Sequence, residues 1–95
     1  MLSLYETEDD DMAMYIKADG TEQSVSPDEG GEFSLKELQG YVDGYIELVH
    51  LPNGKILVVN EDGLWKNLKQ NLRASVLARQ PIVGDCILIE GNQIS

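Results

Sequence analysis

The sequence has very few of the residues that build metal sites and catalytic centres. It contains one cysteine, Cys86, and one histidine, His50. A single cysteine can form neither an internal disulfide nor a zinc cluster, and the apolar stretch around Cys86 indicates a buried thiol. His50 has no second histidine, cysteine or carboxylate pair at a spacing suited to ligation or acid–base catalysis. We therefore expect no metal, no cofactor, no catalytic residue and no enzymatic activity.

Basic residues are also scarce. Lysine and arginine number 7 against 17 aspartates and glutamates, which gives a net charge of −10. Residues 1–48 hold 13 of the acidic residues and two basic ones, whereas residues 49–95 hold four acidic and five basic residues. Because lysine and arginine supply most of a protein's affinity for phosphates, direct binding to nucleic acid is disfavoured. The charge favours a partner with a basic surface.

Long apolar runs are absent. No stretch approaches the roughly 20 apolar residues that span a bilayer, so we expect no membrane segment. The first residues, MLSLYETEDDD, have neither the basic region nor the apolar stretch of a secretory signal, and a cytoplasmic location is the default. Residues 1–11 are dense in like charge, which predicts a mobile acidic tail. Residues 12–95 are expected to form a single domain.

The first part of this domain has a hairpin signal. Asp19-Gly20 lies between two short runs that favour strands, and this pair suits a tight turn with positive φ angles. If the loop has two residues, Lys17 lies opposite Glu22. The stretch PDEGGE, residues 27–32, then indicates a loop.

A second hairpin is predicted in the middle of the chain. Pro52, Asn53 and Gly54 favour a three-residue loop between strands at 45–51 and 55–60. That loop pairs Leu51 with Lys55, and further along it pairs His50 with Ile56, Leu48 with Val58 and Ile46 with Asn60. Both faces of this hairpin are then largely apolar, which predicts a central element covered on both sides.

Two helices and a last strand complete the prediction. Ser34, followed three residues later by Glu37, forms a capping box for a helix at about 35–43 that ends at or near Gly44 and buries Leu35, Leu38 and Val42. A second helix at about 67–79 is indicated by the recurrence every four residues of Leu68, Leu72 and Val76. Pro81 ends it, and residues 86–90 form the last strand. The fold class is α+β: a small, mainly antiparallel sheet of two hairpins and a C-terminal strand, packed with two helices.

The acidic half of the chain supplies the candidate binding residues. A track of carboxylates next to the tail could contact a basic protein or mimic the phosphates of DNA, and its members would be Asp28, Glu29, Glu32, Glu37 and Asp43. The alternative is that the acidity only keeps a small protein soluble, as it does in most acidic domains. Trp65, Tyr5, Tyr15 and Tyr41 could anchor a partner, although the simplest role for Trp65 is to fill the core between helix and sheet.

Several segments carry a resemblance to a known family. KADGTEQSVSP, GEFSLKELQGYVDGYIELVHLPNGKILVVNEDG, the Leu-x-x-Asn-Leu-Arg-Ala helix and IVGDCILIE resemble the short phage- and plasmid-borne proteins of the domain of unknown function family DUF3846, over about residues 12–95. The first eleven residues depart from its pattern. The resemblance implies no catalytic residue. It implies the setting of a mobile element in a bacterial host, where small proteins often bind host proteins and some inhibit defence systems through acidic surfaces.

These observations favour a non-enzymatic protein-interaction module of mobile-element type, whose acidic half binds, and in doing so inhibits, a basic host or defence protein. One alternative is a structural protein that assembles with itself through an exposed strand edge or through the basic helix at 67–79. A small-molecule binder or enzyme is the alternative with the least support, because no convergent polar constellation can be identified in the sequence.

Overall fold

A computed structural model describes residues 13–28 and 30–94 of the chain, so the predicted acidic tail at 1–11 lies outside the described residues. The described strands form one antiparallel sheet with the order β2-β1-β5-β4-β3. The elements, in chain order, are β1 (Ala13–Ile16), β2 (Glu22–Val25), α2 (Leu35–Val42), β3 (Ile46–His50), β4 (Lys55–Asn60), α3 (Leu72–Ala78), β5 (Cys86–Glu90) and the 3₁₀ turn η1 (Gly91–Gln93). The α+β class predicted from the sequence is confirmed.

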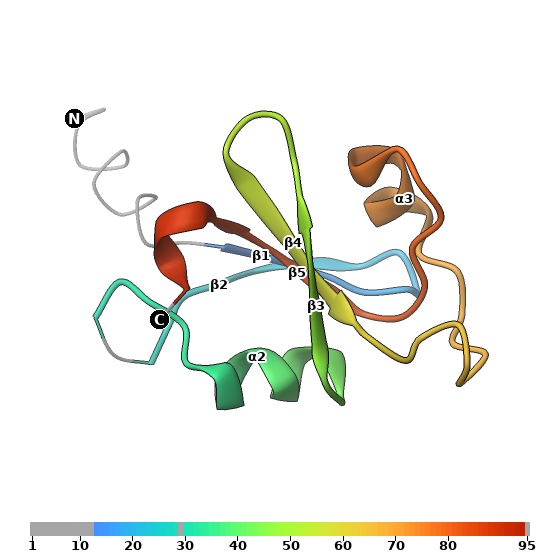
Figure 1. The fold of residues 1–95 in the computed structure, drawn as a ribbon, viewed down its shortest axis with the longest axis horizontal. Coiled ribbons are helices and arrows are strands. Elements are labelled where there is room, and N and C mark those ends of the chain that lie inside the picture. Colours follow the sequence, from blue (N-terminus) through green and yellow to red (C-terminus); the bar gives the residue numbers. More distant parts are fainter. Residues whose placement is uncertain (1–12, 29, 95) are drawn as a thin grey trace.

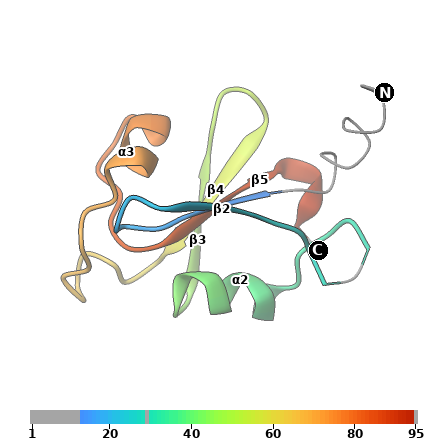
Figure 2. The same cartoon turned by 180° about the vertical axis from the view of Figure 1, so that it is seen from behind.

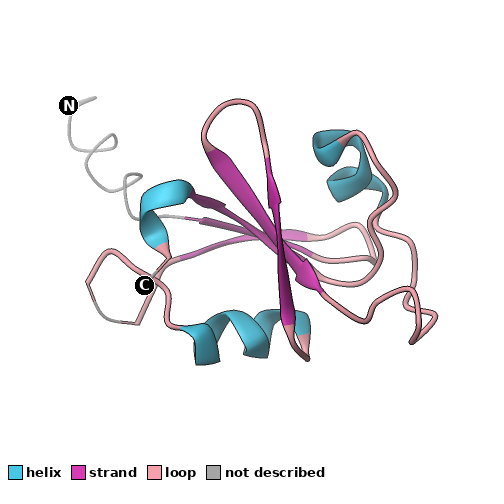
Figure 3. Cartoon of the chain, viewed as in Figure 1, coloured by secondary structure: helices cyan, strands magenta, loops and turns pink. Residues whose placement is uncertain are grey.

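The two helices cover opposite faces of the sheet (Figures 1 and 3). Successive residues of a strand point to opposite faces, so the apolar run of β4 supplies both layers of the core. The layer under α2 contains Ala13, Phe33, Leu38, Val42, Ile56, Val58, Ile87 and Ile89. The layer under α3 contains Ile16, Leu57, Val59, Ala74, Ile82 and Cys86. The interior strands β4 and β5 are therefore the centre of the molecule.

The loop and register predicted for the β3–β4 hairpin are confirmed. The N–H of Leu51 donates to the carbonyl of Lys55 at 2.9 Å, and the N–H of Gly54 donates to the carbonyl of Leu51 at 3.3 Å. His50 lies opposite Ile56, as expected from this loop. Gly54 has φ 84°, the left-handed conformation that lets the residue close the turn.

The prediction that this hairpin is central is only half right. β4 is an interior strand, but β3 forms one edge of the sheet, and several of its side chains are exposed. An apolar pattern on both faces shows that a strand touches two layers, but it does not show whether another strand continues the sheet beyond it.

The β1–β2 hairpin has the same kind of turn as the β3–β4 hairpin, so the predicted two-residue loop is wrong. The N–H of Lys17 donates to the carbonyl of Thr21 at 2.9 Å, and Ile16, not Lys17, lies opposite Glu22. The residue added to the predicted loop is Ala18, whose N–H donates to Asp85 Oδ1 at 2.9 Å and is therefore not available for the ladder. Asp19 Oδ1 accepts the N–H of Thr21 at 2.9 Å, which stabilises this longer turn.

Helix α2 begins at the predicted capping box. Glu37 N–H donates to Ser34 Oγ at 3.1 Å, and the Glu37 carboxylate accepts the N–H of Ser34 at 2.9 Å. At the other end, Asp43, not Gly44, is the left-handed cap, with φ 59°. Leu35 is 55 % exposed, contrary to prediction, because Phe33, immediately before the cap, fills the core at this end of the helix.

The second helix is shorter than the predicted 67–79 and is rotated relative to the prediction. It begins after the N-cap Asn71, and the residues between β4 and Asn71 form turns and irregular structure. Leu72 and Val76 are about 70 % exposed, whereas Ala74 is fully buried. The four-residue spacing of the apolar side chains predicted a helix but not which side of it is buried. The buried side is set by the N-cap Asn71, which is bonded to the sheet.

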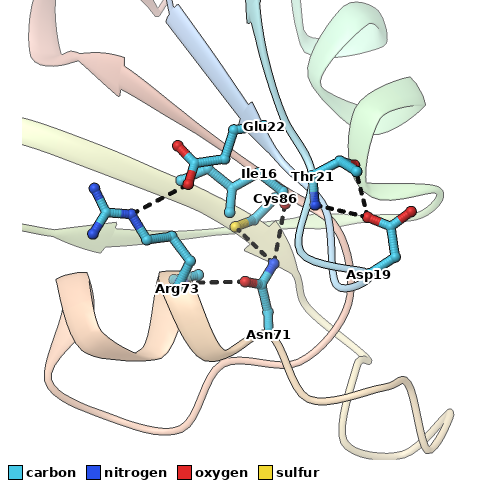
Figure 4. Close-up of polar contacts among 8 residues, drawn as sticks. Ile16, Asp19, Thr21, Glu22, Asn71, Arg73 and Cys86 are labelled. Atoms are coloured by element: carbon cyan, nitrogen blue, oxygen red, sulfur yellow. Dashed lines mark hydrogen bonds and ion pairs between the residues drawn. The ribbon is translucent and has the colours of Figure 1, made fainter.

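Asn71 anchors this region to the sheet (Figure 4). Its amide nitrogen donates to the carbonyls of Ile16 and Gly84 at 3.0 and 2.9 Å, and its Oδ1 accepts the N–H of Ala74 at 3.1 Å. The side chain is 1 % exposed, so all of these bonds are shielded from water. One amide thereby joins the end of β1, the loop before β5 and the start of α3.

Trp65 lies in the turns after β4 and is 90 % exposed, so its predicted role in the core is wrong. The core between α3 and the sheet is filled instead by smaller side chains such as Ala74, Ile82 and Cys86.

Candidate functional site

Two of the predicted acidic residues lie at one hollow on the α2 side of the molecule. The hollow has a volume of about 370 Å³ and lies between β1, α2 and the loop before α2, and we call it the tyrosine hollow. It is lined by Tyr15, Asp28, Glu37, Gly40 and Tyr41. Tyr15 comes from β1, whereas Glu37 and Tyr41 are one turn apart on α2 and therefore share a side of that helix.

The Glu37 carboxylate is held in place by backbone groups. Its Oε1 accepts the N–H of Ser34 and its Oε2 accepts the N–H of Asp28, both at 2.9 Å. These bonds, first the one from Ser34 and then the one from Asp28, hold the pKa of Glu37 below its usual value. The hollow therefore keeps a fixed negative charge at neutral pH.

The two tyrosines form the wall of the hollow. Their rings meet edge to face with centroids 4.8 Å apart, and Tyr41 meets Phe33 in the same manner at 6.2 Å. The Tyr15 hydroxyl donates to the carbonyl of Tyr41 at 3.0 Å, and Asp85 Oδ2 lies 3.4 Å from the same hydroxyl. The wall is therefore tied to α2 by a hydrogen bond as well as by ring packing.

Both phenols stay protonated at neutral pH. Burial, followed by the charge of Asp85, raises the pKa of Tyr15, and burial, followed by the charges of Glu37 and Asp28, raises the pKa of Tyr41. Lys17 Nζ lies 5.9 Å from the centroid of the Tyr15 ring, within the range of a cation–π contact. Neutral aromatic rings beside carboxylates form a surface that attracts a cation.

The other predicted acidic residues lie elsewhere. Glu32 is exposed in the turn before α2, and Asp43 is exposed at the C-terminal end of that helix, about 9 Å along its axis from Glu37. Glu29 lies outside the described residues. Within the described chain, the structure therefore brings together Asp28 and Glu37, joins them to two tyrosines, and leaves Glu32 and Asp43 outside the hollow.

A groove of about 430 Å³ lies on the opposite face of the sheet, beside α3. Its apolar floor includes Met14 and Leu88, and α3 contributes Leu77. Ion pairs lie at its rim: Arg73 Nε is 3.4 Å from Glu22, as Figure 4 shows, and Lys55 Nζ is 3.6 Å from Glu90. The groove thus combines an apolar floor with paired charges at its rim.

Cys86 and His50, which belong to residue types common in metal sites and catalytic centres, lie on different strands of the sheet. Cys86 is fully buried on β5, and burial, followed by the charge of Asp85, raises the pKa of its thiol to about 12. His50 is exposed near the end of the edge strand β3. Among residues 13–28 and 30–94, no group of three His, Cys, Asp or Glu side chains is arranged to hold a metal ion.

No local pattern in the sequence predicts that Tyr15 and Tyr41 meet at one hollow. Tyr15 and Tyr41 are separated by 26 residues, and only the antiparallel sheet with α2 across it brings them together. Asp28 joins them because its N–H is bound by the capping residue Glu37, nine positions along the chain. The capping box was recognisable in the sequence, but the second bond to the Glu37 carboxylate was not.

Comparison with known proteins gives one result. No curated protein and no solved structure matches the chain significantly. In the described chain, no helix is long and apolar enough to cross a membrane. The model of one family, described as a domain of unknown function (DUF3846), matches residues 12–94, which is nearly the whole sequence. This chain therefore belongs to the DUF3846 family.

Proposed function

We propose that this domain is a non-enzymatic protein-interaction module that binds a basic segment of a partner protein, with an arginine or lysine side chain in the tyrosine hollow. The observation that carries the proposal is the placement of Tyr15 and Tyr41 beside the carboxylates of Asp28 and Glu37 around one hollow. Aromatic faces attract cations, and the attraction is strongest where water is partly excluded. Nearby carboxylates add a charge-assisted hydrogen bond to the same cation.

The distribution of charge supports a basic partner. The half of the sequence that contains all five residues of the hollow carries 13 acidic and two basic residues. Such a field attracts a positively charged surface from a distance and raises the rate of encounter, while the hollow supplies the local contact. The resemblance to proteins of phages and plasmids suggests a host protein, such as a component of a defence system, whose activity is inhibited when this domain binds it in the cytoplasm.

The proposal is tested with a synthetic peptide of four Arg-Gly repeats as the probe and a peptide of four Gln-Gly repeats as the neutral control. We expect the arginine peptide alone to shift the ring and amide resonances of Tyr15 and Tyr41 in the folded full chain. Tyr41→Leu should weaken binding by roughly twofold to fivefold, since a cation–π contact contributes about 0.5–1 kcal/mol at a partly exposed site. Tyr41→Phe keeps the ring and should retain most of the affinity.

Asp28→Asn and Asp43→Asn are a matched pair that separates this site from general electrostatic attraction. Each removes one negative charge, but only Asp28 lines the hollow, while Asp43 caps the other end of α2. We expect Asp28→Asn to weaken binding more than Asp43→Asn does. Equal effects of the two variants, or resonance shifts spread over the whole acidic surface, would show that the hollow is not a site.

A further inference from the structure

The two edges of the sheet differ in how far they are protected from pairing with another strand. Edge strands usually carry charges, proline or bulges that prevent such pairing. The side chains of β2 are mainly polar, with Glu22, Gln23 and Ser24 exposed and Pro27 shortly after the strand. β3 has no proline, no lysine and no bulge, and its only carboxylate is Glu47. In Figures 1 and 2 the two edges lie on opposite sides of the molecule, β3 in front in one view and β2 in front in the other.

The outward backbone groups of β3 can be identified from its ladder with β4. Leu51 donates to Lys55 and Tyr45 accepts from Glu61, and inward and outward residues alternate along an antiparallel strand. The N–H and C=O groups of Ile46, Leu48 and His50 therefore point away from the sheet. Their side chains lie on the α2 face, where Leu48 is 37 % exposed.

From this edge we infer that two copies of the chain associate by antiparallel pairing of β3 with β3, with Leu48 opposite Leu48 at a two-fold axis. This register places every outward residue opposite another outward residue, because Ile46 faces His50 of the second copy. The three facing pairs can then form six backbone hydrogen bonds. The result is one continuous ten-stranded sheet, since the described sheet of each copy contributes five strands.

The side chains fit this arrangement as well as the backbone does. Leu48 meets Leu48, and Glu47 lies opposite Val49, so no like charges lie directly across the new ladder. A second copy is therefore complementary to this edge in backbone hydrogen bonding, and its side chains oppose no like charges.

This inference is independent of the proposed function. Tyr15 lies on β1, which β5 and β4 separate from the β3 edge, so the tyrosine hollow stays open in the pair. A paired molecule would then present two hollows. Variants of Asp28 test the hollow and variants of Leu48 test the edge, and either can fail without the other.

The first measurement is sedimentation of the full chain between about 10 μM and about 1 mM, the range in which weak interfaces associate. We expect the mass to rise from the monomer value of 10.5 kDa to twice that value. Association should strengthen with added sodium chloride, because two copies of net charge −10 repel each other and salt screens the repulsion. Association held together by acidic and basic surfaces would weaken instead, and that result would overturn the proposal.

Leu48→Lys and Gln23→Lys provide the matched variants. Each adds one positive charge to an exposed position, the first on the β3 edge and the second on the β2 edge. Leu48→Lys places two lysines directly opposite each other and should weaken pairing by about tenfold or more, whereas Gln23→Lys should leave it unchanged. Equal effects, or a larger effect of Gln23→Lys, would place the interface elsewhere.

Amide hydrogen exchange of the unmodified chain gives a test that does not depend on any variant folding. The amides of Ile46, Leu48 and His50 should exchange quickly in dilute solution and slowly at high concentration, because pairing buries them in hydrogen bonds. Fast exchange at every concentration would overturn the proposal. So would a chain that stays monomeric and gains protection at these amides only with a foreign extended peptide, since the edge would then belong to another partner.

Discussion

Asn71 is a single residue on which three segments of the chain depend. Its amide nitrogen donates to two backbone carbonyls, and its amide oxygen caps α3. The side chain that makes these bonds is buried. An apolar side chain of the same size could fill this space, but it would remove the side-chain donor to the carbonyls of Ile16 and Gly84. Asn60 has a similar role at the other helix, where its amide nitrogen donates to the carbonyl of Val42 at 2.9 Å.

Replacing Asn71 tests this role. Asn71→Ala removes an N-cap, a loss of about 1 kcal/mol, and also removes two buried hydrogen bonds to backbone carbonyls, which costs a further 1–3 kcal/mol or so. We expect the free energy of unfolding, measured with urea, to fall by roughly 2–4 kcal/mol. Asn92→Ala removes the same groups at an exposed position and should change stability by less than about 0.5 kcal/mol. If the two variants unfold alike, the anchor has no energetic importance.

At the scale of elements, the carboxylate of Glu37, in the first turn of α2, accepts two backbone hydrogen bonds. Glu37 closes the capping box with Ser34 and also binds the N–H of Asp28, which fixes the preceding loop against the helix. Both bonds favour the ionised form, so the folded state lowers the pKa of Glu37 from the usual 4.5. A lowered pKa contributes stability that is present above the pKa of the unfolded chain and is lost as the pH falls through that of the folded chain.

The lowered pKa of Glu37 predicts how Glu37→Gln changes stability as the pH falls. A glutamine can keep one acceptor for Ser34 or Asp28 but not both, and it does not titrate. The variant should be less stable than the natural chain at pH 7, and the difference should shrink below about pH 5 as Glu37 takes up its proton. Glu32→Gln, which removes the same charge from an exposed turn, is the control. If the difference in stability between Glu37→Gln and the natural chain stayed constant across the pH range, the two hydrogen bonds would not depend on the ionised Glu37 carboxylate.

The elements also show what the sequence could and could not predict. The β3–β4 register follows from Pro52-Asn53-Gly54, because a turn is a local structure whose residues each have a conformational reason to be there. The orientation of α3 does not follow from the spacing of Leu68, Leu72 and Val76, because a distant carbonyl, that of Ile16, holds the cap Asn71. The signal that could have found it is Asn71 itself, a good N-cap three residues before the buried Ala74.

The residues of the tyrosine hollow were predictable to a smaller degree. Charge counting indicated the acidic half of the chain, and two of its residues, Asp28 and Glu37, do lie together. The tyrosines that complete the hollow come from separate elements, and only tertiary packing places them there. The sequence also did not predict that β3 lies at an edge of the sheet. The position of β3 depends on which strand pairs with the other side of β4. That strand is β5, which comes after β4 and α3 in the sequence.

At the scale of the whole molecule, β5 is the central strand of the sheet. It pairs with β1 on one side and with β4 on the other, and its residues contribute to both core layers. Cys86, at the start of β5, is therefore covered from every direction and becomes accessible only when the sheet opens. Its thiol, with a pKa of about 12, is also almost entirely protonated.

We expect iodoacetamide to modify Cys86 through global unfolding. At pH 8 the folded chain should react at least about 10³-fold more slowly than the chain unfolded in urea, a factor that reflects the unfolding equilibrium of an ordinary domain. Below the unfolding transition, the rate should rise with urea as the free energy of unfolding falls. Rapid labelling without urea would show instead that α3 and the loop before β5 open locally.

The exposure of Trp65 has a practical consequence for spectroscopy. It is the only tryptophan of the chain, and its indole is already surrounded by water in the folded state. Unfolding therefore changes its surroundings little, and its fluorescence is a poor measure of whether the domain is folded. The same emission is a sensitive reporter of contact, because any molecule that covers the turn after β4 moves the indole out of water and shifts its emission to shorter wavelength.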